Sequence, residues 1–329
     1  MSAQDILFIG GSGVISAASV QRAVAAGHRV VVLNRGRSDE RPLPDEVELL
    51  QADIHDEDSV RAALGAREFD VVAQFTSFVP AHVRADIERF DGRIGQYLFI
   101  SSASAYQKPP LRYPITESTP LRNPFSAYAR NKIACEDTLV AAYRDRGFPV
   151  TIVRPSHTYD RTSMPTLAGW NDVARMREGR PVVVHGDGTT PWTITHTTDF
   201  AVGFVGLFGR RDVQGDTFHI TGDHAPTWNQ IYTWLGEAAG VEPDLVHVSS
   251  DAIAAIRPSL ADDLHGDRSF PMVFDNTRIR RIVPEFEPRV PFWTGAEEII
   301  AYHDATPSRQ VVDVDLDRDL DRMVESVRG

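Results

Sequence analysis

Residues 5–16 read DILFIGGSGVIS, which places a glycine-rich turn between an apolar run of strand length and the start of a helical pattern. A phosphate group needs backbone N–H donors at close range and the positive end of a helix dipole, and glycine permits both the tight turn and the close approach. Ser16 stands where a third glycine would complete the common form of this motif, and serine is the least disruptive replacement. We therefore expect the turn to bind the pyrophosphate of a dinucleotide through Gly10, Ser12, Gly13, Val14 and Ile15.

Further apolar runs of strand length follow the turn, separated by stretches with helical spacing. They are continuous runs of Val, Ile and Leu, which are typical of strands buried on both faces. The alternation predicts βαβ units and an α/β fold with a doubly wound parallel sheet of the Rossmann type. We expect a dinucleotide-binding domain over residues 1–158. Residues 159–329 should form mainly a smaller C-terminal substrate-binding region, with some segments returning to the main sheet. The expected strands of the first half are residues 6–9, 30–33, 47–50, 71–75, 97–100 and 150–153.

The composition excludes several classes of protein. The formal net charge of −12 disfavours a nucleic-acid partner, because an acidic surface repels phosphate backbones. The sequence shows neither an apolar run long enough to cross a membrane nor an export signal, so we expect no membrane partner and a cytoplasmic location. The single cysteine, Cys135, excludes an intramolecular disulfide framework, and the spacing of the histidines predicts no metal site. The charge-dense segment 313–329 is typical of a solvated terminal helix.

The residues after the second expected strand bear on the choice of cofactor. An acidic residue there would bind the ribose 2′-hydroxyl of NAD and repel the 2′-phosphate of NADP. The chain instead has Asn34, followed by Arg35 and Arg37, whose guanidinium groups suit a phosphate. We expect NADP as the preferred cofactor and NAD as the alternative, although a solvated basic turn would also explain the pattern. Asp53 and Ile54, after the third strand, are placed to contact the adenine ring, and Asp53 also suits a plain turn.

Tyr128 and Lys132 form the second chemically informative pattern. A spacing of four residues puts both side chains on one face of a helix, although a surface pair would also show this spacing. The ordinary pKa of tyrosine, about 10, is too high for a base at neutral pH, but a nearby ammonium group and an oxidised nicotinamide both favour the phenolate. Ser102 follows the fifth strand at the carboxyl edge of the sheet, where doubly wound folds bind ligands. These residues predict that Ser102 orients a reacting oxygen, Tyr128 exchanges its proton and Lys132 lowers the pKa of Tyr128.

These motifs together resemble the extended short-chain dehydrogenase/reductase superfamily. Within it, the chain is similar to the NAD-dependent epimerase/dehydratase family, which includes UDP-galactose 4-epimerase. The stretches that carry the resemblance are GGSGVIS (residues 10–16), SSASAY (101–106), YARNK (128–132) and the pair at 53–54.

The resemblance assigns further roles to residues of this chain. It implies that Ser102, Tyr128 and Lys132 are catalytic and that Tyr128 and Lys132 also contact the cofactor. The remaining cofactor residues that it implies are Phe75, Thr76 and Ser77 beneath the cofactor, and Pro155 and Ser156 beside the nicotinamide.

The chain also departs from the family pattern. Ala103 and Ser104 replace the Asp-Glu pair with which family dehydratases remove water, so a sugar dehydratase is disfavoured. His157 stands where many epimerases have an asparagine that contacts a diphosphate, and Trp192 stands near the place of a diphosphate-binding arginine. These changes put a nucleotide-sugar substrate in doubt. We expect Ser104, His157 and Trp192 to contact the substrate, with packing of Trp192 between the two halves, or a loop hydrogen bond from His157, as alternatives.

The resulting hypothesis is an NAD(P)-dependent oxidoreductase or epimerase that acts on a secondary alcohol or ketone of a small, sugar-like substrate. Reduction and epimerisation share this chemistry, so both stay open. The alternative is a non-catalytic dinucleotide-sensing or RNA-associated member of the superfamily, which the intact serine, tyrosine and lysine argue against. Family likeness and the prevalence of two-fold oligomers predict a homodimer, with the helices after Phe78 and Phe125 as its interface.

Overall fold

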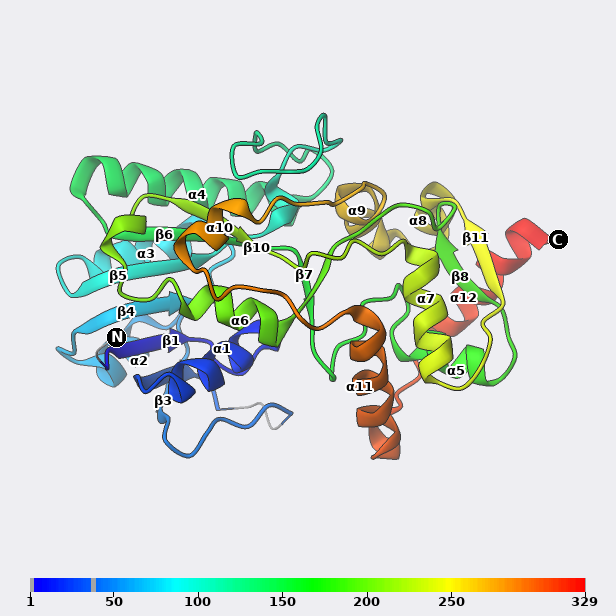
Figure 1. Ribbon diagram of the computed structural model, residues 1–329, viewed down its shortest axis with the longest axis horizontal. Helices are drawn as coiled ribbons and strands as arrows, with labels where there is room; N and C mark the ends of the chain where they lie inside the picture. Colours follow the sequence, from blue (N-terminus) through cyan, green and yellow to red (C-terminus); the bar gives the residue numbers. More distant parts are fainter. Residues whose placement is uncertain (1–2, 37–39, 329) are drawn as a thin grey trace.

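The computed structural model describes residues 3–36 and 40–328 and is built around a sheet of seven parallel strands (Figure 1). The strand order is β10-β6-β5-β4-β1-β2-β3: the chain winds outward from β1 to β3, then crosses to β4 and continues to β10. This is the predicted doubly wound arrangement. The strands are β1 (Asp5–Ile9), β2 (Arg29–Asn34), β3 (Glu48–Gln51), β4 (Phe69–Gln74), β5 (Ile94–Ile100), β6 (Val150–Pro155) and β10 (Thr217–Ile220).

Helices cover both faces of the sheet, because its central strands are apolar on both sides. In β1, Ile6 and Phe8 pack into one helical layer, while Leu7 and Ile9 pack into the other. All four side chains are fully buried, which explains why the run does not alternate with polar residues. The first layer contains α1 (Val14–Ala25) and α6 (Thr197–Val205), and the second contains α2 (Glu57–Leu64), α3 (Pro80–Phe90) and α4 (Ala127–Arg146).

The smaller part of the molecule lies beyond the carboxyl ends of the strands, on the right in Figure 1. It contains two short parallel strand pairs, β7 with β9 and β8 with β11. Aromatic side chains, among them Trp192 and Trp228, fill its core. Its elements are β7 (His157–Tyr159), α5 (Trp170–Arg177), β8 (Val182–His185), β9 (Ile194–His196), α7 (Trp228–Ala238), β11 (Leu245–Val248), α8 (Ser250–Ile256), α9 (Ala261–Asp263), α11 (Phe292–Asp304) and α12 (Val314–Arg328).

Part of the second half returns to the large sheet. β10 pairs in parallel with β6, α6 packs on α1, and α10 (Thr277–Ile282) packs on β10. The two halves of the chain are therefore interleaved in space, although they are consecutive in sequence. None of the helices in the described ranges is long and apolar enough to span a membrane.

The C-terminal helix α12 is packed against the smaller part and is not simply solvated, as its charge density suggests. Leu320 and Met323 are fully buried. Arg175 of α5, which is 1% exposed, donates hydrogen bonds to the carboxylates of Asp317 at 2.9 Å and Asp321 at 2.8 Å. Two carboxylates of this helix thus pair with a buried guanidinium group, so the charge density of the segment did not mean that the helix is simply solvated.

Candidate functional site

The glycine-rich turn connects β1 to α1 and has a left-handed backbone at two positions, with φ of +117° at Gly10 and +86° at Gly11. A Cβ atom on Gly10 would lie 3.3 Å from both Phe75 Cβ and Thr76 Cγ2, so the turn lies close against the end of β4. Gly13 precedes the first residue of α1, and no side chain caps the first N–H groups of that helix. These groups are therefore directed at whatever lies in front of the turn.

A groove of about 600 Å³ opens in front of this turn. Ser16 shows how the chain tolerates the missing third glycine, because its Oγ accepts a hydrogen bond from the Gly13 N–H at 2.8 Å. Asp53 Oδ1 accepts from the His55 N–H at 3.0 Å and thus holds a turn, while the residue also lines the groove. Of the residues expected at the cofactor, those lining the groove are Gly10, Ser12, Gly13, Val14, Ile15, Asn34, Arg35, Asp53, Ile54, Phe75 and Thr76.

The turn at the end of β2 is held by neutral groups. Asn34 Oδ1 accepts a hydrogen bond from the Gly36 N–H at 2.7 Å, and Gln51 Nε2 donates to the main-chain carbonyl of Arg35 at 3.2 Å. The side chain of Arg35 is exposed at this end of the groove. Arg37 lies outside the described residues. The position of Asn34 presents no carboxylate to this end of the groove.

Strand β5 and helix α4 bring the expected catalytic side chains together. Ser102 follows the end of β5, and its Oγ accepts from the Ser104 N–H at 3.1 Å and lies 2.9 Å from the Ser104 Oγ. Helix α4 begins after Ser126, so Tyr128 is in its first turn and Lys132 is one turn further along the same face. Ser102, Tyr128 and Lys132 all line a single cavity.

Lys132 is fixed beneath this cavity. Its Nζ donates hydrogen bonds to the main-chain carbonyls of Ser77 and Ile100, both at 2.8 Å. It also lies 4.8 Å from the ring centre of Phe78 and 5.8 Å from that of Tyr128. Burial lowers the pKa of Lys132 to about 8, so the amine is mostly protonated at neutral pH. Lys132 is thus a positioned cation close to the Tyr128 ring.

The environment of Tyr128 differs from the sequence-based expectation. Burial of its hydroxyl raises the pKa of Tyr128 above the usual value of 10, and the hydrogen bond with Ser102 offsets this only in part. The residue as a whole is 44% exposed. Lys132 does not lower this pKa in the protein alone, because its ammonium group is directed at two carbonyls. The protein by itself therefore holds Tyr128 as a neutral phenol.

Ser77 has a different part in the site from the one that the resemblance implies. Its side chain does not line the groove, because its Oγ donates to Asp86 Oδ2 at 3.1 Å within the interior. The same carboxylate accepts from Gln74 Nε2 at 2.6 Å and from the Tyr97 hydroxyl at 2.7 Å. This network positions the carbonyl of Ser77 that holds Lys132. No sequence motif signals Asp86, because these partners come from two other segments, the end of β4 and strand β5.

A second buried network supports the end of β5. Glu136 accepts a bidentate pair of hydrogen bonds from Arg154, at 2.9 Å and 2.5 Å, and a further hydrogen bond from the Ser101 hydroxyl. The Arg154 guanidinium lies 4.9 Å from the ring centre of Tyr106. Helix α4, strand β6 and the residue before Ser102 are thereby tied together. The one sequence signal for Glu136 is its position four residues after Lys132, on the same helix face.

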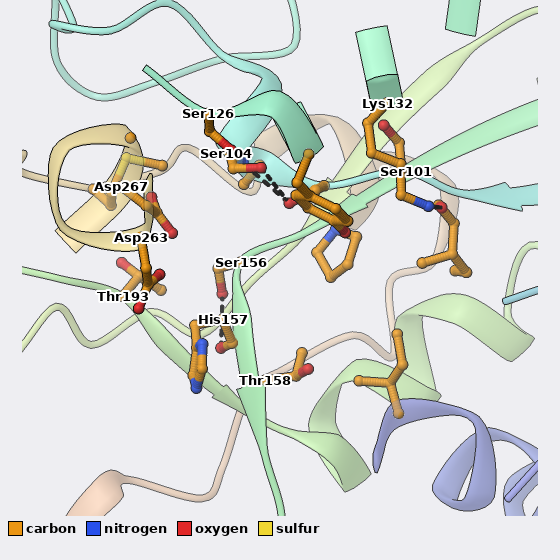
Figure 2. A pocket seen from close by; sticks show the side chains of 18 of the residues that line it. Ser101, Ser104, Ser126, Lys132, Ser156, His157, Thr158, Thr193, Asp263 and Asp267 are labelled. Carbon is orange, nitrogen blue, oxygen red and sulfur yellow. Dashed lines mark hydrogen bonds between the residues drawn. The ribbon is translucent and has the colours of Figure 1, made fainter. Parts of the chain in front are cut away.

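The cavity behind Ser102 and Tyr128 has a volume of about 580 Å³ and continues the groove. Val14, Ile15, Phe75 and Phe78 line both spaces. Pro155 and Ser156, expected beside the nicotinamide, line the cavity, as do the expected substrate residues Ser104, His157 and Trp192. Figure 2 shows Ser156, His157 and Thr158 along one side of this cavity.

Trp192 and His157 form an aromatic wall. Their ring centres are 4.9 Å apart, and Trp192 packs 4.4 Å from Trp228 on its other side. Burial, together with the charge of Arg268, lowers the pKa of His157 to about 3, so the imidazole is neutral at physiological pH. Trp192 therefore packs in the core of the smaller part and also lines the cavity. A packing role for this residue and a substrate contact are thus compatible.

Three carboxyl groups that sequence reasoning missed complete the lining. Asp262, Asp263 and Asp267 come from α9 and the π-helical turn that follows it (residues 264–268). They lie more than 130 residues after Tyr128 in the sequence, which is why no local pattern connects them to it. Within the described ranges, no group of three or more His, Cys, Asp or Glu residues is arranged to hold a metal ion.

The model of the NAD-dependent epimerase/dehydratase family matches residues 6–94 and 89–221. The chain belongs to this family. The resemblance inferred from the glycine turn and the Tyr-Lys pair is thereby confirmed, and the protein is an enzyme of the oxidoreductase and epimerase type.

Proteins similar to this chain carry different names. The chain is 27% identical to the 2′-dehydrokanamycin reductase of Streptomyces kanamyceticus, over 86% of this chain and 80% of the relative. It is 27% identical to the chloroplast stem-loop binding protein of 41 kDa b of Arabidopsis thaliana, over 75% of this chain and 66% of the relative. The structure of UDP-glucose 4-epimerase from Thermotoga maritima with UDP-glucose superposes with a TM-score of 0.74 at 20% identity, over 92% of this chain and 99% of the other. That last likeness supports the fold alone.

Proposed function

We propose that this member of the NAD-dependent epimerase/dehydratase family is an NADP-dependent reductase of a ketone on a sugar-like substrate. The observation that carries the proposal is the meeting of Ser102, Tyr128 and Lys132 where the groove joins the cavity. A dinucleotide in the groove and a substrate in the cavity would have their reactive ends at this junction. NADPH, when bound, supplies the hydride.

The ionisation of Tyr128 favours reduction. A neutral phenol is a proton donor, so the Tyr128 hydroxyl gives its proton to the oxygen of the ketone as that carbon is reduced to a secondary alcohol. The Ser102 hydroxyl orients the same oxygen. The Lys132 ammonium, held by two carbonyls, keeps its position beneath the cavity, and a proton from solvent restores the phenol.

The turn after β2 supports NADP over NAD. Asn34 has no charge to repel a 2′-phosphate, and Arg35 is exposed where the adenosine end of the groove terminates. A guanidinium group binds phosphate through charge-assisted hydrogen bonds. The family name gives NAD dependence, so the preference for the phosphorylated cofactor is the specific part of the proposal.

Two features support a sugar-like ketone as the substrate. The relative from Streptomyces kanamyceticus is named for the reduction of 2′-dehydrokanamycin, and it aligns over most of both chains. The cavity combines an aromatic wall at His157 and Trp192 with the hydroxyl groups of Ser104 and Ser126, which suits a polar ring with apolar faces. A stem-loop-binding role like the one named for the chloroplast relative is not favoured, because the serine, tyrosine and lysine are intact and the cavity wall is acidic.

The proposal is tested by following the hydride. NADPH carrying deuterium at its transferable position is incubated with the enzyme and a panel of sugar ketones, and the alcohols are analysed by mass spectrometry. Deuterium on the product carbinol carbon supports a reductase. Inversion of a sugar alcohol with no net oxidation of NADPH would instead show an epimerase, and equal turnover by wild type and Tyr128→Phe would reject the assigned proton donor.

A further inference from the structure

One end of the substrate cavity carries an asymmetric set of charges. Asp262, Asp263 and Asp267 line it, whereas Lys132 is the one lysine or arginine among the described residues of the lining. In the view of Figure 2, Asp263 and Asp267 lie at the same end as Thr193, and Lys132 lies at the opposite end. The part of the cavity away from the hydride-transfer position is therefore acidic.

The positive partners of these carboxylates are located behind the wall. Lys108 is fully buried, and its Nζ lies 3.4 Å from Asp267 Oδ1. Arg268 is 7% exposed; it donates to Asp263 Oδ2 and, at 2.7 Å, to the carbonyl of Pro165. Each cation pairs with one oxygen of its carboxylate, and neither lines the cavity. A ligand in the cavity thus meets the carboxylates and not their partners.

The electrostatic state of Asp267 indicates that another positive charge would be accommodated. Burial and the neighbouring charge of Asp263 both raise the pKa of Asp267, against the influence of Lys108 and Arg268. A further cation beside Asp267 would favour the charged form of that carboxyl group. The third carboxylate, Asp262, is exposed at the rim and accepts a hydrogen bond from the Ala127 N–H at 3.3 Å.

Buried neutral donors in the same wall point independently to a ligand. Thr193 is 2% exposed and Trp192 is 1% exposed, and both line the cavity. The main-chain N–H of Thr193 donates to the Met272 carbonyl at 3.0 Å. The Thr193 hydroxyl and the indole N–H of Trp192, however, have no hydrogen-bond partner among the residues that the structure describes. Both groups are thus left to pair with what occupies this end of the cavity, and a polar ligand there would supply the partner.

The chemistry of the wall discriminates between classes of ligand. A nucleotide diphosphate would place two negative charges against three carboxylates, which is unfavourable in a partly desolvated cavity. A metal ion is not supported, since the described residues contain no cluster with suitable geometry. A protonated amine satisfies the carboxylates, and sugar hydroxyls satisfy Thr193 and Trp192.

We propose that Asp262, Asp263 and Asp267 form a subsite for an ammonium group, so that the substrate is an amino sugar and not a nucleotide sugar. This inference rests on the proposed function, because it concerns the substrate of the same cavity. The amine is bound at the α9 end while the ketone is held at Ser102 and Tyr128.

The test is calorimetric titration of the protein saturated with NADP⁺. The probes are neamine, a small aminoglycoside rich in primary amines, its fully N-acetylated derivative, and UDP-glucose. We expect neamine to bind at least about tenfold more tightly than either of the others. Asp267→Asn should weaken neamine by about 10- to 150-fold, the range for a lost charge-assisted hydrogen bond, and should leave the acetylated probe unchanged.

Two further variants test whether weaker neamine binding could come from a disturbed fold and not from the loss of a carboxylate. Asp262→Asn removes an exposed carboxylate without disturbing a buried pair, and it should weaken neamine about threefold to tenfold. Asp58→Asn removes a charge that is 92% exposed on α2, outside the cavity lining, and should change nothing. Thermal melting identifies any variant that fails to fold.

Equal affinity for neamine and its acetylated derivative, or tighter binding of UDP-glucose, would overturn the amine subsite. These outcomes do not depend on turnover, so they are separate from the test of the proposed function. Neamine should bind Tyr128→Phe as it binds wild type. If Tyr128 is not the proton donor, the amine subsite still stands. If the amine subsite is rejected, hydride transfer to neutral sugar ketones still stands.

Discussion

Replacement of Tyr128 by phenylalanine removes one oxygen atom and little else. The ring keeps its place 6.5 Å from Phe78 and 5.8 Å from the Lys132 ammonium, and Lys132 keeps both of its carbonyl partners. The loss is confined to the hydroxyl and its hydrogen bond with Ser102. We therefore expect the free energy of unfolding to change by no more than about 1 kcal/mol.

The effect on turnover should be far larger. A positioned proton donor contributes about 10²- to 10⁴-fold to the rate, which corresponds to about 3–5 kcal/mol of the activation barrier. Ser102 can still orient the carbonyl oxygen, so substrate affinity should be nearly unchanged. The expected signature is a large fall in kcat with a constant KM.

The assay is steady-state oxidation of NADPH with a ketone substrate, combined with a fluorescence titration of NADPH. Tyr143→Phe is the matched control, since Tyr143 lies on the same helix α4, is 38% exposed and does not line the cavity. Its kcat and NADPH affinity should equal those of wild type. A fall in kcat of less than about tenfold for Tyr128→Phe, or a parallel loss of NADPH binding, would refute the reasoning.

The remaining predictions concern the cofactor, stability and assembly. Arg35→Ala should weaken NADP binding by about 10- to 150-fold and leave NAD affinity nearly unchanged in fluorescence titrations; equal losses would show that the residue stacks on adenine instead. Glu136→Gln, which leaves the buried Arg154 without its charge partner, should lower the free energy of unfolding in urea by about 3–5 kcal/mol, and a loss below about 1 kcal/mol would contradict the pairing. Because burial lowers the pKa of Lys132 to about 8 from 10.5, the unfolded chain binds more protons than the folded protein between these values. The free energy of unfolding of wild type should therefore rise with pH between about 8 and 10.5, and it should rise by about 3 kcal/mol more than that of Lys132→Met. A difference between the two proteins that stays constant over this pH range would exclude the lowered pKa of Lys132. Light scattering should report a homodimer, for which the exposed Phe125 before α4 and Phe78 before α3 are candidate contacts; a monomer at micromolar concentration would reject it.

Local patterns in the sequence determined the architecture of the large sheet. The apolar runs that begin near Ile6, Val30 and Val71 became β1, β2 and β4, because a strand buried on both faces needs continuous apolar residues over a short length. The turn at Gly10 was equally predictable, since its positive φ can be adopted without strain only by glycine. These properties depend on neighbours within a few residues and can be interpreted without knowledge of the rest of the chain.

For Tyr128 and Lys132, local patterns predicted the position of the side chains but not their ionisation. The spacing of Tyr128 and Lys132 placed them on one face of α4, as helix geometry requires. The sequence-based prediction that the pKa of Tyr128 is lowered was nevertheless wrong for the protein alone, in which this pKa is raised. It depends on how deeply the hydroxyl is buried and on the carbonyls of Ser77 and Ile100, to which the Lys132 ammonium is directed.

The character of the substrate cavity was decided by tertiary structure alone. Asp267 and Trp192 come from segments that share no motif with Tyr128, and they line one cavity because α9 and β9 pack beyond the carboxyl ends of the large sheet. The charges of α12 likewise gave no sign that Asp317 would pair with a buried Arg175. Periodicity and turn chemistry report on a few consecutive residues, whereas the charge of a cavity is set by contacts between segments that are distant in the sequence.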